Sequence, residues 1–133
     1  MGAKYAVQLI VPAEAGSARL ARLVAAGVAA DANFTLDDTE DLRVAVSELV
    51  ALLVEGAEKT DEHLTLTYQR SEDAVEVSGE RLMPSGAAGG SDDGSTPDDL
   101  ALEILRVVVD QHRYEHDESG RHFHLVKRAR ASA

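Results

Sequence analysis

The residue of this chain best placed for acid–base chemistry is Glu48, and the residue one helical turn after it is Leu52. Glu48 lies in the largely apolar stretch Asp41 to Ala57, where a carboxylate could serve as a general base. Leu52 follows four residues later and shares its side of a helix. A leucine side chain offers no lone pair, so it cannot serve as a metal ligand. Glu48 is equally compatible with an ordinary polar residue on a helix flank.

Two further sets of residues could bind a ligand. Histidines gather near the end of the chain, at positions 112, 116, 122 and 124. His122 and His124 would share one strand face as a zinc pair, but no cysteine and no clear third ligand accompanies them, so we expect solvated histidines of a hairpin. The glycine-rich segment 89–94 could cradle a phosphate or, through Asp92 and Asp93, a cation. A flexible surface loop is the simpler interpretation.

The composition predicts a single cytoplasmic domain spanning residues 1–133. The chain is 44% hydrophobic, lacks cysteine and carries a formal net charge of −11. It has neither a signal-peptide pattern nor an apolar run near the roughly 20 residues of a membrane span. The negative charge repels phosphate backbones, which disfavours direct nucleic-acid binding. This charge would suit a partner with a basic surface, or simply keep the chain in solution.

The elements that would position these residues begin with a strand and two helices. Lys4 to Val11 alternates in hydropathy and ends at Pro12, which predicts a strand. Helical spacing of apolar residues predicts a helix from Ser17 to about Ala30. Its apolar face comprises Leu20, Leu23, Val24 and Val28. After a turn-like break at residues 31–34, a second helix is predicted from about Thr39, its N-cap, to Ala57, and the acidic run at 37–41 is its solvated start.

The second half of the chain predicts two hairpins with a loop and a helix between them. The first hairpin joins His63–Arg70 to Ala74–Ser78, and the second joins Arg113–His116 to Arg121–Lys127. The glycine- and serine-rich stretch Arg81 to Pro97 predicts a long mobile loop.

The third helix completes a recognisable element order. It is predicted to start at Thr96, with Pro97 at the first position and Asp98 and Asp99 in the first turn. Adjoining strands favour an antiparallel sheet. The order therefore predicts an α/β (α+β) two-layer sandwich, with a mostly antiparallel sheet and helices on one face.

The stretch Asp41 to Ala57 resembles the helix that opens the nucleotide site in ATPases of the GHKL superfamily, and among them the anti-sigma-factor serine kinases of the RsbW and SpoIIAB type. In that family the helix carries a glutamate that acts as general base or organises water. Four residues later an asparagine holds the magnesium that bridges the ATP phosphates. Glu48 matches the glutamate, and Leu52 stands at the asparagine position. The likeness runs from about Tyr5 to Lys127 and implies the GHKL (Bergerat) fold.

The same resemblance implies two glycine motifs, and this chain departs from both. Family members carry Asp-x-Gly-x-Gly, whose aspartate reads the adenine amino group; Ser78 and Glu80 stand at the aspartate and first-glycine positions. A second glycine-rich motif begins the third helix and receives phosphate on backbone amides, where this chain has Pro97, Asp98 and Asp99. Two carboxylates there would repel a triphosphate.

We therefore expect a degenerate nucleotide site that binds no cofactor and no metal. Glu48 would be a vestigial catalytic residue. The vestigial pocket positions would be Leu52, Ser78, Glu80, Asp98 and Asp99.

The resemblance also draws attention to two arginines on the first helix. In the kinases, the start of this helix helps to hold the sigma factor, and an arginine contributes. Arg22 fits that place best by its distance from Glu48, and Arg19 lies one helical turn away. A guanidinium fork suits a carboxylate on a partner, although a solvated helix face would carry the same residues. The family further implies a homodimer.

Three functional hypotheses follow. The leading one is a non-enzymatic module that sequesters a transcription factor, a sigma factor foremost, and releases it to a competing antagonist. The alternative is an active ATP-dependent serine kinase acting on an anti-anti-sigma (STAS-type) protein, with Glu48 and substitute ligands from Asp92, Asp93 or Asp98. The third is a degenerate domain with an unrelated partner or small ligand.

Overall fold

The computed structural model describes residues 5–57, 62–82 and 99–130. The described elements are, in order, β1 (Tyr5–Pro12), a short 3-10 turn (Ala15–Ser17), α1 (Ala18–Ala29), α2 (Leu36–Val54), β2 (His63–Arg70), β3 (Ala74–Leu82), α3 (Asp99–Val108), β4 (Gln111–Asp117) and β5 (Gly120–Arg128). None of these helices is long and apolar enough to cross a membrane.

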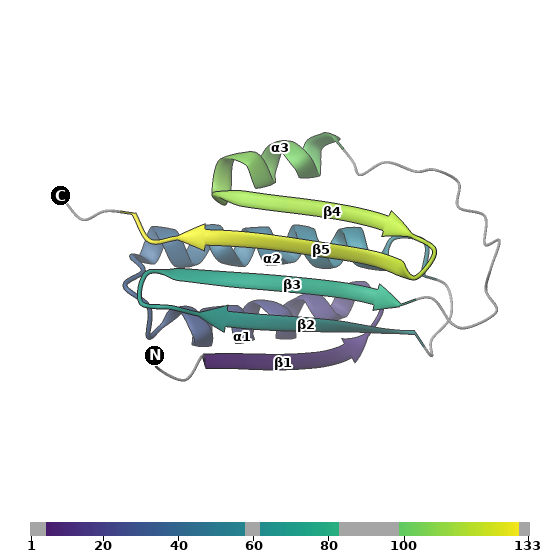
Figure 1. Ribbon diagram of the computed structural model, residues 1–133, viewed down its shortest axis with the longest axis horizontal. Coiled ribbons are helices and arrows are strands. Elements are labelled where there is room, and N and C mark those ends of the chain that lie inside the picture. Colours follow the sequence, from purple (N-terminus) through teal and green to yellow (C-terminus); the bar gives the residue numbers. More distant parts are fainter. Residues whose placement is uncertain (1–4, 58–61, 83–98, 131–133) are drawn as a thin grey trace.

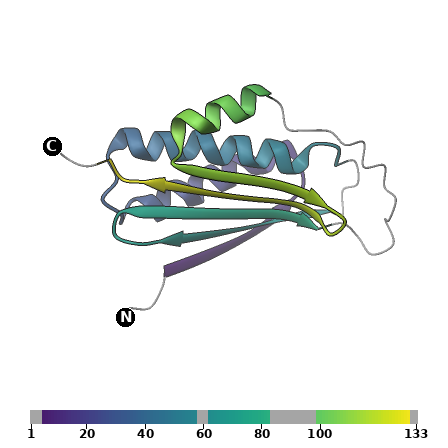
Figure 2. The same cartoon turned by 45° about the horizontal axis from the view of Figure 1, so that its top comes forward.

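The five strands form one sheet in the order β1-β2-β3-β5-β4, and every neighbouring pair is antiparallel. Helices α1 and α2 cover one face of this sheet, and α3 lies beside α2 near the β4 edge (Figures 1 and 2). The other face carries no helix of the described residues. The predicted two-layer α+β fold is therefore confirmed.

Strand periodicity builds the core between the sheet and α2. Leu64, Leu66 and Tyr68 alternate with exposed or half-buried residues along β2 and are fully buried. Gly79 lies where α2 comes closest to the sheet. A Cβ atom at this position would come within 2.7–2.8 Å of side chains on Leu49, Leu53 and Leu66. Helix α2 can therefore lie directly on β3.

Helix α2 begins three residues before its predicted start region, so the assignment of Thr39 as N-cap is wrong. Thr35 is the N-cap and forms a capping box with Asp38. The Asp38 amide donates to the Thr35 hydroxyl and the Thr35 amide donates to the Asp38 carboxylate, each at 3.0 Å. The helix ends at Val54 rather than Ala57, and Gly56 follows with φ +78°.

Strand β3 extends to Leu82, past its predicted end at Ser78 and into the start of the loop predicted from Arg81. Glu80 pairs with Thr65 of β2, and Leu82 pairs with Gly120 of β5. Ladder bonds to both neighbours thus continue the strand past Ser78. The remainder of the predicted loop, with Thr96 and Pro97, lies outside the described residues.

The apolar face predicted for α1 is wrong at two of its four positions. Leu20 and Leu23 are 50% and 63% exposed, whereas Ala21, Ala25 and Val28 are buried. The buried residues on this helix are mostly alanines, and the hydroxyl of Tyr68 reaches the Ala21 carbonyl at 2.9 Å. Small side chains let α1 approach the sheet closely, which leaves the two leucines on the outside.

Candidate functional site

Glu48 and Leu52 lie one turn apart on α2 but in different surroundings. Leu52 is 4% exposed and belongs to the hydrophobic core. Glu48 is half-buried, and among the described residues it makes no hydrogen bond or ion pair. Leu52 is therefore a core residue rather than a metal ligand. The Glu48 carboxylate, by contrast, has no partner among the described residues.

Two buried arginines meet the end of α2 at Leu52. The Arg121 guanidinium donates to the Leu52 carbonyl at 3.0 Å, and the Arg81 guanidinium donates to the Leu53 and Glu55 carbonyls at 2.8 and 3.0 Å. The last carbonyls of a helix have no partner within the helix, and positive charge is favourable at this end of its dipole. We call Arg81 and Arg121 the arginine clamp.

Acidic and phenolic groups lie beside the positive charges of the arginine clamp. Arg81 Nε lies 3.3 Å from Glu62 Oε1, and Arg121 Nη1 lies 3.4 Å from Glu55 Oε1 and 3.3 Å from the Tyr114 hydroxyl. Burial lowers the pKa of the Arg81 guanidinium, and the neighbouring Arg121 cation lowers it further. Burial also raises the pKa of Tyr114. The two cations are therefore close enough to act on one another inside the protein.

Neither member of the clamp was predicted from the sequence, although period-two alternation indicates that both face the core. Val75, Val77 and Gly79 point toward the helices, and Arg81 follows in the same phase. Arg121 is in phase with Phe123 and Leu125 on β5. A charged residue in a core-facing phase must find partners when it is buried.

The remaining predicted pocket positions do not join Leu52. Ser78 and Glu80 alternate with the core-facing residues of β3 and therefore lie on the face of the sheet away from α2. Glu80 Oε1 lies 3.3 Å from His122 Nδ1 of β5. Asp98 lies outside the described residues, and Asp99 is the first described residue of α3. The sheet therefore separates Ser78 and Glu80 from Glu48 and Leu52.

The donor set at this end of α2 does not suit a magnesium ion. Leu52 supplies an alkyl group, and its carbonyl already accepts a hydrogen bond from Arg121. The two guanidinium groups of the clamp would repel a divalent cation. Within the described ranges, no group of three or more His, Cys, Asp or Glu could hold a metal ion. Asp92 and Asp93, the proposed substitute ligands, lie outside those ranges.

The four histidines do not form one cluster. His122 and His124 lie on the outer face of β5, half-exposed, near the carboxylates of Glu80 and Glu76 respectively. His112 is half-buried on β4, and its ring stacks on Phe123 with centroids 6.5 Å apart. All four histidines keep part of their surface exposed, and His112 differs in stacking on a core ring.

The start of α2 holds a second buried charge, so the interpretation of residues 37–41 as fully solvated is also wrong. Asp38 is fully buried. Its Oδ1 lies 3.8 Å from Lys127 Nζ and 3.4 Å from Arg130 Nε. Burial raises the pKa of Asp38, but hydrogen bonds from the Thr35 and Arg130 amides, the Thr35 hydroxyl and the Lys127 charge together hold it below the ordinary value.

On α1, the two predicted contact arginines differ in how firmly they are held. Arg22 is half-buried, and its Nη1 donates to the Ser47 hydroxyl of α2 at 2.9 Å. Arg19 is exposed and makes no hydrogen bond or ion pair within the described part of the chain. Leu20 and Leu23 are exposed beside them. We call Arg19, Leu20, Arg22 and Leu23 the α1 surface.

Comparison with known proteins identifies the family of this chain. The sequence profile of the histidine kinase-like ATPase domain matches residues 11–127. The chain is also 35% identical over 72 residues to the serine-protein kinases RsbW of Bacillus mycoides (strain KBAB4) and Bacillus cereus (strain B4264). These alignments cover 53% of this chain and 45% of each relative, so the match spans less than half the length of the curated relatives. Because the family profile extends from β1 to β5, this chain belongs to the histidine kinase-like ATPase domain family of the GHKL type.

Proposed function

We propose that this domain is a regulatory protein-binding module of the anti-sigma type whose nucleotide site no longer binds ATP. The observation that carries the proposal is the burial of Leu52 in the core, at the position where kinases of this family place their magnesium ligand. An ATP site that depends on magnesium needs an oxygen donor there. Leucine cannot supply one in any rotamer.

The arginine clamp supports the same proposal. Arg81 and Arg121 satisfy the carbonyls of Leu52, Leu53 and Glu55, so the end of α2 is held by side chains of this chain. A structure that needs no ligand to complete this region can persist as a binding scaffold after catalysis is lost.

The α1 surface supports a protein partner. It combines two exposed leucines with two arginines, and arginine is among the residue types enriched in binding hot spots. We infer that the partner presents a carboxylate to Arg22 and is a sigma factor or the anti-anti-sigma protein that competes for it. A homodimer also fits the family resemblance, and sedimentation equilibrium would contradict it by finding only monomer.

Titration calorimetry with Mg-ATP tests the loss of nucleotide binding. We expect no saturable heat in the millimolar range, with magnesium alone and ATP alone as matched controls. Saturable binding that requires both components would contradict the proposal. A titration with a purified sigma factor tests the partner separately, because the α1 surface can bind whether or not ATP does.

The alternative function, a serine kinase, is favoured by one observation. Glu48 is half-buried and uncommitted among the described residues, so its carboxylate is free to act as a base. Transfer of labelled phosphate from ATP to a STAS-type protein, abolished by Glu48→Gln, would establish this activity. No transfer by the parent protein is the result that our proposal predicts.

A further inference from the structure

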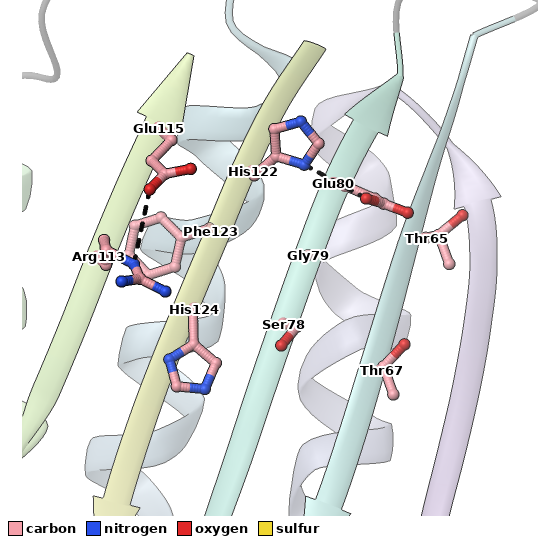
Figure 3. A pocket seen from close by; sticks show the side chains of 10 residues that line it. All are labelled: Thr65, Thr67, Ser78, Gly79, Glu80, Arg113, Glu115, His122, Phe123 and His124. Carbon is pink, nitrogen blue, oxygen red and sulfur yellow. Dashed lines mark ion pairs between the residues drawn. The ribbon is translucent and has the colours of Figure 1, made fainter. Parts of the chain in front are cut away.

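The face of the sheet opposite the helices carries a hollow of about 320 Å³. It crosses β2, β3, β5 and β4, and Figure 3 shows its polar side chains projecting from the strands while the helices lie behind them. The helix layer holds Glu48, Leu52 and the α1 surface, so this hollow is a separate feature. No step of the proposed function uses it.

The strand register arranges part of the lining as a row across the sheet. Thr65 pairs with Glu80, Glu80 pairs with His122, and His122 pairs with Glu115. Directly opposed residues on one face of a sheet have neighbouring side chains. His122 therefore has a carboxylate on each side of it. Neighbouring strands are about 4.8 Å apart, so these two carboxylates belong to strands about 10 Å apart.

The row is held in place at its centre. His122 Nδ1 lies 3.3 Å from Glu80 Oε1, and His122 Nε2 lies 2.9 Å from the Ser119 hydroxyl and 3.5 Å from Asp117 Oδ1. The imidazole is thus fixed by groups on both sides. The side chains of Glu80 and Glu115 remain 41% and 59% exposed, so their carboxylates can still meet a ligand.

The second row adds hydroxyl and imidazole groups and the one fixed cation of the lining. Ser78 pairs with His124, and His124 pairs with Arg113. Arg113 Nε lies 3.8 Å from Glu115 Oε2, and its side chain is 74% exposed. The lining carries two carboxylates and one guanidinium, in a chain whose formal net charge is −11.

The chemistry of these lining groups favours one kind of ligand in the hollow. The projecting side chains offer hydroxyl and carboxylate acceptors, so an apolar partner would gain little by covering them. An anion would meet two carboxylates and the field of an acidic chain. A flexible cationic side chain would find several acceptors and a complementary charge.

We propose that this hollow docks a basic segment of a protein partner, with lysine or arginine side chains received by Glu80 and Glu115. Thr65 and Ser78 provide additional oxygen acceptors beside them. The site does not depend on the fate of the nucleotide pocket, because it lies on the opposite face of the sheet. Failure of either proposal would therefore leave the other standing.

Hexalysine peptide is a suitable probe, titrated calorimetrically into the parent and two variants at low ionic strength. The site variant is Glu80→Gln with Glu115→Gln. The matched control is Glu40→Gln with Glu103→Gln, which changes the net charge equally on the helix layer, where both residues are exposed. We expect the site variant to raise Kd about fivefold or more and the control to stay within about twofold of the parent.

Three results would overturn the proposal. Equal weakening in both variants would mean that hexalysine senses only the overall charge, and absence of saturable binding to the parent would mean that the hollow is not a site. Spermine binding as tightly as hexalysine, with the same sensitivity to the site variant, would assign the hollow to a small polyamine instead. Amide chemical-shift changes in the parent provide an independent check. They should centre on β3, β4 and β5, and changes centred on α1 would contradict the proposed location.

Discussion

Helix α2 is held at both ends by buried charges, but the two ends differ in sign and in what they can respond to. At its start, the Asp38 carboxylate caps the first turn and meets Lys127 and Arg130. At its end, Arg81 and Arg121 receive the last carbonyls. Both arrangements complement the helix dipole. Acid can neutralise the carboxylate at the start of the helix, whereas acid cannot remove the charge of a guanidinium group.

The two ends also differ in what they contribute to the proposal that this domain binds no nucleotide. Capping at the start of a helix by a carboxylate is common and says little about function. Two buried guanidinium groups at the end of a helix are costly to desolvate, so they need several acceptors to be tolerated. Both lie beside Leu52, because Arg121 donates to the Leu52 carbonyl and Arg81 to the Leu53 carbonyl.

The largest effect is expected from breaking the guanidinium end. Arg81→Ala would leave Glu62 without its cation and two α2 carbonyls without donors, so we expect a loss of about 3–5 kcal/mol in the free energy of unfolding. Urea denaturation measures this. Arg106→Ala, which removes an exposed arginine paired with Glu103, is the control and should cost less than about 0.5 kcal/mol. A loss under about 1 kcal/mol for Arg81→Ala would show that the clamp does not hold the helix.

The next effect concerns Leu52 itself. Leu52→Asn removes a buried aliphatic group and leaves an amide without a partner, so we expect a loss of about 2–4 kcal/mol. Ala51→Asn places the same amide on an exposed position of α2 and should cost less than about 1 kcal/mol. Neither variant should gain ATP hydrolysis. If Leu52→Asn costs under about 0.5 kcal/mol, then Leu52 lines an open cavity.

A smaller effect, on binding rather than folding, is expected at the α1 surface. Arg22→Ala should weaken partner binding at least about tenfold, because Ser47 already orients its guanidinium. Arg19→Ala should have a milder effect, since this side chain must be ordered on binding. Both variants should unfold at the parent's urea concentration. Affinities equal to the parent's in both variants would remove α1 as the contact surface.

The smallest effect is expected at the start of α2, where acid can neutralise the Asp38 carboxylate and so lower the stability of the fold. The folded-state pKa of Asp38 lies below its ordinary value, so its ionised form stabilises the fold above about pH 4. That contribution should be lost as the pH falls through the folded-state pKa. Asp38→Asn should therefore flatten the decline in unfolding free energy on the acid side. Asp37→Asn, an exposed neighbour, should leave the decline unchanged, and identical acid profiles for parent and Asp38→Asn would refute the assignment.

The sequence predicted the layers of this fold better than its details. Strand alternation and helical spacing were enough for the sheet and the element order. They failed at Leu20 and Leu23, because size and hydropathy favoured leucines for the face that alanines occupy. The capping box at Thr35 was overlooked in favour of Thr39, although Asp38 stands three residues after Thr35.

The candidate site was harder to predict than the fold, because its composition depends on the face of the sheet on which each β3 side chain lies. Leu52 was identified because it follows Glu48 by four residues, at the asparagine position of the helix that this stretch resembles. Ser78 and Glu80 were placed by motif position, and only the strand register shows that they lie across the sheet from Leu52. Arg81 and Arg121 come from distant segments, so no local pattern joins them to α2. Assignment of the whole chain as one cytoplasmic domain remains a prediction.

The thermal unfolding of the parent protein with and without Mg-ATP tests the central claim most directly. A ligand that binds only the folded state at a hundredfold excess over its Kd would add about 2.7 kcal/mol, which raises the melting temperature by several degrees. Because Leu52 and the arginine clamp complete the end of α2 without a ligand, we predict that millimolar Mg-ATP leaves the melting temperature unchanged. A rise of several degrees that saturates with ATP and disappears when magnesium is chelated would contradict the account.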